Sequence, residues 1–139
     1  MRAEIGREAY ELNVQQFCCA GLNFGYFYTG SPIIVADGEA PPPYSMGDFA
    51  PSTVPGCRAP HLWLADGRSL YDAFGSGYTL LRFDRRVDIQ ALEEAARAAR
   101  VPLSVLDVEA KEIPRAYRHR LVLCRADQHV AWRGDRIPA

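Results

Sequence analysis

The sequence has little of what marks a nucleic-acid-binding, membrane or secreted protein. Lys111 is its only lysine, and 16 basic against 17 acidic residues leave a formal net charge of −1. This balance gives no electrostatic reason to expect nucleic acid or an anionic membrane as a partner. No apolar run approaches the ~20 residues of a transmembrane helix, and the first residues lack the apolar segment of a signal peptide. We therefore expect a cytoplasmic protein.

The sequence also offers little for cysteine or metal chemistry. It has four cysteines, and none is spaced as C-x-x-C, the pattern of zinc sites and redox dithiols. Cys18 and Cys19 are adjacent, and adjacent cysteines rarely form an unstrained disulfide. We expect Cys124 to be a buried thiol within a strand and Cys57 to be exposed in a loop. His129 has no second histidine or cysteine at ligand spacing, so we predict no metal site.

The composition fits one domain with an extended arm. Hydrophobic residues make up 48% and charged residues 24% of the 139 residues, which is ordinary for a soluble globular protein. Residues 1–57 are irregular and rich in glycine, tyrosine and proline. We interpret them as an N-terminal arm and proline-rich linker from a preceding domain. Residues 58–139 alternate strand and helix patterns, and we predict that they form the C-terminal domain.

Local patterns predict the elements of the arm. Residues 3–16 carry apolar side chains along one face and predict a helix. Residues 21–28 are aromatic with interspersed glycines, which indicates an extended strand that another backbone or ring approaches closely. Residues 31–36 predict a short strand that ends in a turn at 37–38. Three consecutive prolines at 41–43 indicate a stiff, extended linker.

The second region predicts an α/β fold. Residues 78–83 and 103–108 are strand patterns, and the helix pattern at 89–100 lies between them, so the two strands should be parallel with a right-handed crossover. Residues 121–125 and 129–133 predict an antiparallel hairpin. The order βαβ followed by ββ is that of a thioredoxin-like fold. A redox thioredoxin has its dithiol directly after the first of these strands, where this chain reads DRRV.

Several motifs in order resemble a known family. The hairpin contains RADQHVAWRG at residues 125–134, and PSTVPGCRAPHLWL at 51–64 and DGRSLYDAFG at 66–75 precede it. Together with the aromatic segment 21–28, these motifs resemble the C-terminal part of the FAD-dependent aromatic hydroxylases. The similarity covers nearly the whole chain and is strongest to the phenol-hydroxylase branch of the para-hydroxybenzoate hydroxylase–phenol hydroxylase group.

The resemblance implies a function for a parent enzyme and a supporting role for this chain. Enzymes of this family reduce FAD with NAD(P)H, capture O2 as a C4a-hydroperoxide and hydroxylate a phenolic ring, and this chemistry belongs to the flavin. We expect the chain to be the parent's C-terminal structural and oligomerisation module. It would contact the FAD and substrate domains, form a homodimer and have no catalytic residue. The alternative is a free-standing, redox-inactive thioredoxin-like protein-binding module.

The sequence lacks the glycine motifs with which the family holds FAD. Those enzymes bind the pyrophosphate at a G-x-G-x-x-G turn and at a later Gly-Asp pair before a helix. In this chain the segment from Gly75 to Gly77 lacks the third glycine and precedes a strand pattern. The Gly-Asp pairs at 47–48 and 134–135 lie in a loop and in the C-terminal tail. We therefore predict no flavin ligand in this chain.

Two groups of residues are candidates for a site. The arm aromatics Phe24, Tyr26 and Tyr28 are expected at an interface, or on the substrate side of the parent enzyme. The second group is a predicted polar network that pins the linker to the domain: Arg58, His61, Asp66 and Arg68. A role for His61 as a general base would require a partner carboxylate, with Asp66 and Asp72 as candidates.

Overall fold

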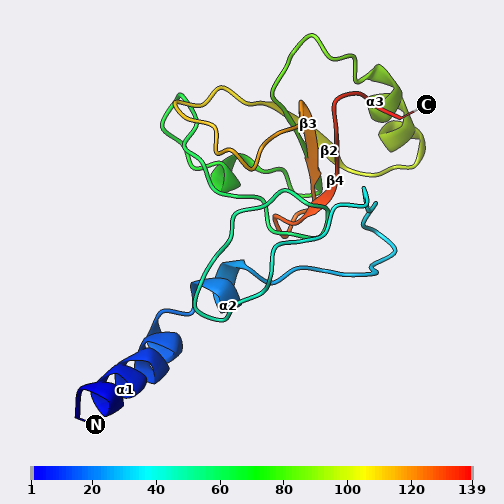
Figure 1. Ribbon diagram of the computed structural model, residues 1–139. Coiled ribbons are helices and arrows are strands. Elements are labelled where there is room, and N and C mark those ends of the chain that lie inside the picture. The colour runs from blue at the N-terminus through cyan, green and yellow to red at the C-terminus, as the bar shows by residue number, and fades with distance from the viewer. Residues whose placement is uncertain (1, 139) are drawn as a thin grey trace.

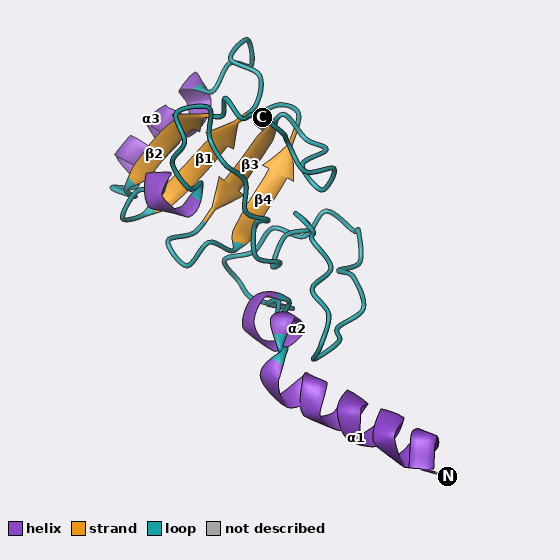
Figure 2. Cartoon of the chain, turned by 90° about the vertical axis from the view of Figure 1, so that its left-hand side faces the viewer, coloured by secondary structure: helices purple, strands orange, loops and turns teal. Residues whose placement is uncertain are grey.

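The computed structural model describes residues 2–138, apart from the side chains of residues 15 and 16. A four-stranded mixed sheet with strand order β2-β1-β3-β4 forms its centre (Figure 2). The strands are β1 (Tyr78–Arg82), β2 (Leu103–Asp107), β3 (Leu121–Cys124) and β4 (Val130–Gly134). Strands β1 and β2 are parallel, whereas β3 is antiparallel to both β1 and β4. The predicted βαβ unit and the hairpin are thereby confirmed.

Helix α3 (Gln90–Ala98) connects the two parallel strands. The carboxylate of Asp88 accepts a hydrogen bond from the Gln90 backbone N–H at 2.9 Å, which satisfies one of the free donors of the first turn. The chain leaves the helix through Arg100, whose φ is +55°. Helical geometry is disfavoured at the next residue because Pro102 follows it. The helix therefore lies within the predicted range 89–100.

The core lies on both faces of the sheet. Leu81 and Val122 belong to one fully buried cluster, covered by the loops before β1 and after β2, while Leu80 and Leu121 belong to the other, beside α3. This division follows from the alternation of side chains along a strand. One of the covering loops contains the short 3-10 helix η1 (Tyr71–Ala73).

The arm begins with α1 (Arg2–Phe17), which projects away from the sheet, followed by α2 (Ala20–Phe24) (Figure 1). The first helix confirms the prediction, but the strand predicted for residues 21–28 is wrong in its first half. At Gly21 an added Cβ would lie 1.7 Å from the backbone oxygen of Ser45. The proline-rich segment packs against this turn of helix, which only glycine permits.

The remaining arm predictions hold in part. Extended pairing starts at Phe27, which forms a single antiparallel bridge with Cys57. The segment predicted as a strand at 31–36 is not one, although Val35 N–H donates to the Ala131 carbonyl at 2.8 Å along the edge of β4. Cys57 was expected to be exposed and is instead buried, and its burial raises the thiol pKa. Within residues 2–138, no helix has the length and apolar character needed to cross a membrane.

A buried guanidinium fastens the arm to the sheet. The side chain of Arg133 on β4 is 1% exposed, and it donates to Asp37 at 2.6 Å, to Glu39 at 2.5 Å and to Thr53 at 3.2 Å. On the surface, Arg118 also donates to Glu39 at 2.6 Å. We call these five residues the Arg133 network. It joins two segments of the arm to the last strand of the sheet.

Both carboxyl groups of the network have a lowered pKa. At Asp37, partial burial acts to raise the pKa, but hydrogen bonds from Arg133 and the Glu39 N–H outweigh it. At Glu39, the hydrogen bond from Arg118 is the largest cause, and Arg133 adds to it. A carboxyl group with a lowered pKa in the folded state adds stability above its ordinary pKa. That stability is lost as the pH falls through the folded-state pKa.

We predict that Arg133→Gln destabilises the fold by about 1.5–3 kcal/mol, the range for hydrogen bonds to charged groups. The stability lost between neutral pH and about pH 3, below the ordinary carboxyl pKa, should be smaller in this variant than in the wild type. Urea unfolding at several pH values measures both quantities. Arg136→Gln on the exposed tail is the matched control and should behave like the wild type. Equal stability of the two variants would contradict the prediction.

Candidate functional site

The predicted arm aromatics meet the domain at one place. Tyr26 and Tyr28 pack against His129, with ring centroids 4.9 and 4.7 Å from the histidine ring, while Phe24 lies beside Arg58. We call these five residues the aromatic junction. It lies at the turn of the β3–β4 hairpin, where the arm crosses the domain.

Backbone pairing positions the junction. Tyr28 N–H donates to the Gly56 carbonyl at 3.0 Å, and Gly56 N–H donates to the Val130 carbonyl at 2.7 Å. Gly56 has φ +100°, and an added Cβ would lie 2.3 Å from the Tyr28 carbonyl oxygen. Both the conformation and the close approach require glycine at this position. Arm, linker and hairpin therefore lie side by side in a fixed register.

His129 is the buried centre of the junction. Its Nδ1 lies 3.0 Å from the backbone oxygen of Asp127, and because a carbonyl oxygen only accepts, Nδ1 carries the proton in this contact. The side chain is fully buried, and Nε2 has no hydrogen-bond partner among the described residues. The two tyrosine rings cover the imidazole. This arrangement holds the ring in place and leaves no open position beside it for a substrate.

Arg58 joins the arm to the hairpin. Its guanidinium carbon lies 5.2 Å from the Phe24 ring centroid and 5.1 Å from that of Tyr71. Its Nε donates to the Gln128 side-chain oxygen at 2.9 Å, and Nη2 donates to the same oxygen. A cation placed between aromatic rings contributes about 0.5–2 kcal/mol per contact, depending on desolvation. Arg58 thus connects arm, linker and hairpin through one side chain.

Among the described residues, Arg58 forms no hydrogen bond or ion pair with the other members of the predicted polar network, although Arg58 and His61 both contact the ring of Tyr71. His61 Nε2 is 3.0 Å from Ser69 Oγ, and no carboxylate within residues 2–138 forms an ion pair with it. Asp66 and Arg68 form their own surface pair at 2.7 Å. The pKa of Asp66 is lowered, first by the backbone N–H of Arg68 and then by its side chain. The geometry offers His61 no acid partner for general-base catalysis, and we assign no catalytic residue.

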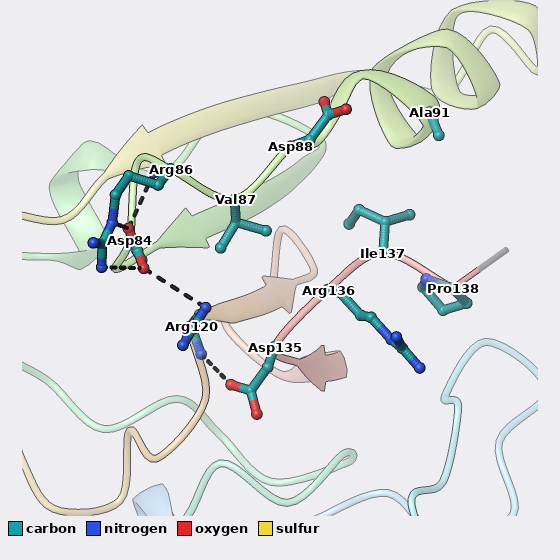
Figure 3. A pocket seen from close by; sticks show the side chains of 10 residues that line it. All are labelled: Asp84, Arg86, Val87, Asp88, Ala91, Arg120, Asp135, Arg136, Ile137 and Pro138. Atoms are coloured by element: carbon teal, nitrogen blue, oxygen red, sulfur yellow. Dashed lines mark hydrogen bonds and ion pairs between the residues drawn. The ribbon is translucent and has the colours of Figure 1, made fainter.

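A polar pocket of about 760 Å³ lies at the N-terminal end of α3, where a phosphate group would be expected to bind (Figure 3). Asp84 and Asp88 line it, and the Asp88 carboxylate already accepts the first free N–H of the helix. The hydrogen bond from Arg86 lowers the pKa of Asp84 to about 2, so this side chain is an anion at neutral pH. Arg120 also lies near Asp84, at 3.9 Å.

These residues do not fit the pyrophosphate of FAD. Three carboxylates, Asp84, Asp88 and Asp135, line the pocket together with the guanidinium groups of Arg86, Arg120 and Arg136. The Asp88 carboxylate already occupies the helix N–H from which a phosphate would accept a hydrogen bond, and Arg86 is paired with Asp84. We therefore assign no flavin ligand in this chain. The part of the chain that the structure describes also contains no cluster of three or more His, Cys, Asp or Glu that could hold a metal ion.

A comparison with known families shows the family to which the chain belongs. A family described as "Aromatic-ring hydroxylase, C-terminal" matches residues 52–139. The chain belongs to this family. The matched region starts close to the predicted domain boundary at residue 58 and contains Gly56, Arg58, His129 and Arg133 from the contacts described above.

Curated relatives of this hydroxylase C-terminal domain are much longer proteins. An FAD-dependent monooxygenase of Emericella nidulans, apdD, is 34% identical over 84% of this chain and 20% of its own length. A phenol 2-monooxygenase of a Pseudomonas species is 30% identical over the whole of this chain and 25% of its own length. The chain thus spans at most about a quarter of these two relatives.

Solved structures agree with this assignment. The substrate-free form of the rebeccamycin biosynthetic enzyme RebC matches 99% of this chain and 25% of its own, with a TM-score of 0.77 and 35% identity. A ternary complex of aklavinone-11 hydroxylase with FAD and aklavinone matches 86% of this chain and 24% of its own, with a TM-score of 0.66 and 28% identity. The observed α/β fold is therefore that of the C-terminal domain of flavin monooxygenases.

The residues that sequence reasoning missed are the ones that join arm and domain. His129 was considered only as a metal ligand, and Arg133 only as part of a motif. His129, Ala131 and Arg133 occupy every second position of the predicted hairpin strand and therefore share one of its faces. Two of these three side chains are polar, although a strand at the sheet edge should bury apolar side chains on its core face. That alternation is the signal that could have marked both as partners of another segment.

We predict that the 139-residue chain binds no FAD, because its sequence contains no G-x-G-x-x-G turn and the Asp88 carboxylate already accepts the first free N–H of α3. Protein purified in the presence of excess FAD should lose its flavin absorbance on dialysis. The double variant Asp84→Asn, Asp88→Asn should remain without flavin, since neutralising the carboxylates does not supply the missing glycine turn. Stoichiometric FAD that the wild type retains after dialysis would overturn the prediction.

Proposed function

We propose that this chain is the C-terminal module of a flavin monooxygenase that hydroxylates a phenolic ring with NAD(P)H and O2. The family match over residues 52–139 carries the proposal, and the similarity to a phenol 2-monooxygenase supports the substrate class. When bound in the parent, the flavin would supply the oxygen chemistry. The module itself would have a structural role. We also propose that its fold is thioredoxin-like.

The contacts of the arm support a structural role. The Arg133 network and the aromatic junction hold residues 26–39 against the sheet. Phe24, Tyr26 and Tyr28 nevertheless remain 45%, 42% and 37% exposed to solvent. A rigidly held row of aromatic groups is suited to contact with another domain, since little conformational entropy is lost on docking. We infer that this surface faces the flavin and substrate domains of the parent, or its substrate pocket.

The test compares this chain with the complete polypeptide encoded by its gene. We expect a reading frame that also encodes a G-x-G-x-x-G turn, and a full-length product that retains FAD and consumes NAD(P)H and O2 when a phenol is added. The 139-residue chain should show neither property. A gene product without an FAD-binding region would refute the proposal.

That outcome would favour the second candidate, a free-standing protein-binding module in a cytoplasmic setting. The exposed arm aromatics favour this candidate, because a protein-binding module would need such a surface for its partner. A partner protein that binds the wild type but not the Tyr26→Ser variant would support this second candidate.

Self-association is a separate prediction for the isolated chain. Exposed apolar patches above a few hundred Å² usually mark an interface, and the arm exposes Leu22, Phe24, Tyr26 and Met46. We predict a dimer about a two-fold axis with Phe24, Tyr26 and Tyr28 at the contact. Sedimentation should show a dimer for the wild type and a monomer for the double variant Phe24→Ser, Tyr26→Ser.

Two controls accompany this measurement. Trp63→Ser removes an aromatic group that is 59% exposed in a different part of the chain, and it should leave the dimer intact. Circular dichroism must show that the double variant keeps its fold, because Phe24 also contacts Arg58. A wild type that remains monomeric at high micromolar concentration contradicts the prediction whatever the variants do.

A further inference from the structure

A row of three aromatic rings ends at an exposed tryptophan. Leu62 and Leu64 are buried in the core. Because side chains alternate along an extended segment, His61 and Trp63 point outward between them. The ring centroid of His61 lies 4.9 Å from that of Trp63 and 5.4 Å from that of Tyr71, in edge-to-face geometry. Trp63 is thereby held in place, yet it remains 59% exposed. A fixed indole with so much free surface is suited to stack on another planar group.

Backbone pairing places the connection after β2 beside this segment. Leu64 forms a bridge with Ala110. The Ala65 N–H donates to the Glu109 carbonyl at 2.6 Å. Between the two segments lies a pocket of about 360 Å³, which is within the range of about 300–1,000 Å³ that is usual for small-molecule sites. Its lining comes from both segments: His61, Leu62, Trp63, Lys111, Glu112 and Pro114.

The two charged side chains of this pocket have no partner within the described part of the chain. Neither the ammonium group of Lys111 nor the carboxylate of Glu112 forms a hydrogen bond or an ion pair there. The neighbouring Glu109, in contrast, pairs with Arg85 at 2.7 Å. The pocket therefore presents a free cation and a free anion beside the exposed ring of Trp63.

We propose that this pocket binds a free aromatic amino acid. The aromatic ring of the ligand would stack on Trp63. Its carboxylate would accept hydrogen bonds from the Lys111 ammonium group, and its own ammonium group would donate to the Glu112 carboxylate. Each charged group of the pocket thus meets the opposite charge, and a ligand with only one of the two charges leaves a group of the pocket unsatisfied. This inference goes beyond the proposed function and does not depend on it.

The chain provides a reporter for each half of the pocket. It has two tryptophans and one lysine. Trp132→Phe therefore leaves Trp63 as the single fluorophore, and lysine labelled with an NMR-active carbon at Cε gives one side-chain signal. L-Phenylalanine is the probe, because its own fluorescence does not overlap that of tryptophan. It should shift the Trp63 emission to the blue and move the Lys111 signal. Both changes should share a roughly millimolar midpoint, since a small ligand at an open site gains little free energy per atom.

Three ligands that each lack one group of phenylalanine test the contacts separately. L-Phenylalaninamide lacks the carboxylate, N-acetyl-L-phenylalanine lacks the ammonium group and L-cyclohexylalanine lacks the aromatic ring. The first two should bind about two- to fivefold more weakly than L-phenylalanine, the range for a single exposed ion pair. L-Cyclohexylalanine should also bind more weakly, because it cannot stack on the indole.

Substitutions should remove these preferences one at a time. Lys111→Met should bind phenylalanine and its amide equally, whereas Glu112→Gln should bind phenylalanine and its N-acetyl form equally. Trp63→Leu, followed through the Lys111 signal, should bind phenylalanine and cyclohexylalanine equally. All three side chains are exposed, so the thermal midpoint of each variant should equal that of the wild type. Arg115→Met is the control, because Arg115 is exposed on the same connection and does not line the pocket. It should keep every preference.

The proposal is overturned if all four ligands act alike or if the Trp63 emission changes without saturation. An N-acetyl form that binds as tightly as phenylalanine points instead to the C-terminal residue of a peptide, which also overturns it. Calorimetry on the complete polypeptide should show the same weakening by Lys111→Met. Binding by the 139-residue chain alone would mean that another region fills the pocket, and would refute the proposal for the complete protein. A gene product without an FAD-binding region that still binds phenylalanine in this way refutes the proposed function alone.

Discussion

The buried guanidinium of Arg133 is the contact on which the placement of the arm depends. A charge so far from solvent is tolerated only when its donors are paired, because desolvation of an isolated ion is very costly. The three side chains that accept its hydrogen bonds all come from residues 1–57: Thr53 lies in the linker, and Asp37 and Glu39 of the arm provide both carboxylates. Undocking the arm would therefore remove both of its charged partners. This cost makes the arm a part of the fold, although its helices contribute little to the core.

Once Asp37 and Glu39 are anchored, the rest of the arm has little freedom. The segment between these anchors and the helices must pass the edge of β4 and the turn of the hairpin, where Val35 and Tyr28 form their backbone hydrogen bonds. Gly56 permits the close approach of Tyr28, and Arg58 fills the space between the rings of Phe24 and Tyr71. The aromatic junction and the ionic anchor thus hold the arm at two places, and the backbone hydrogen bond of Val35 lies between them.

The limits of sequence reasoning follow from the same contacts. The strands, α3 and the hairpin were predictable because their signals are local: alternation, helical spacing and a tight polar turn. The helix at 20–24 was not, because Gly21 and its aromatic neighbours favour an extended chain until the Ser45 backbone packs against them. The partners of Arg133 lie 94 and 96 positions away, and nothing local distinguishes Asp37 and Glu39 from the other acidic residues. Burial of Cys57 likewise depends on the arm that covers it.

Most of the polar groups described above are paired with one another and hold the structure of the module. Arg82 pairs with Asp107 at 2.6 Å, Arg86 pairs with Asp84, and Arg58 is shared between an amide and two rings. Burial raises the pKa of the Cys57 and Cys124 thiols, so neither is poised as a nucleophile. A catalytic group needs an accessible position with a free donor or acceptor directed at a substrate. His129 Nε2, a buried nitrogen without a hydrogen-bond partner among the described residues, is instead covered by two tyrosine rings. Among the described residues, the paired guanidinium groups and the covered imidazole thus serve to attach the arm and to brace the sheet.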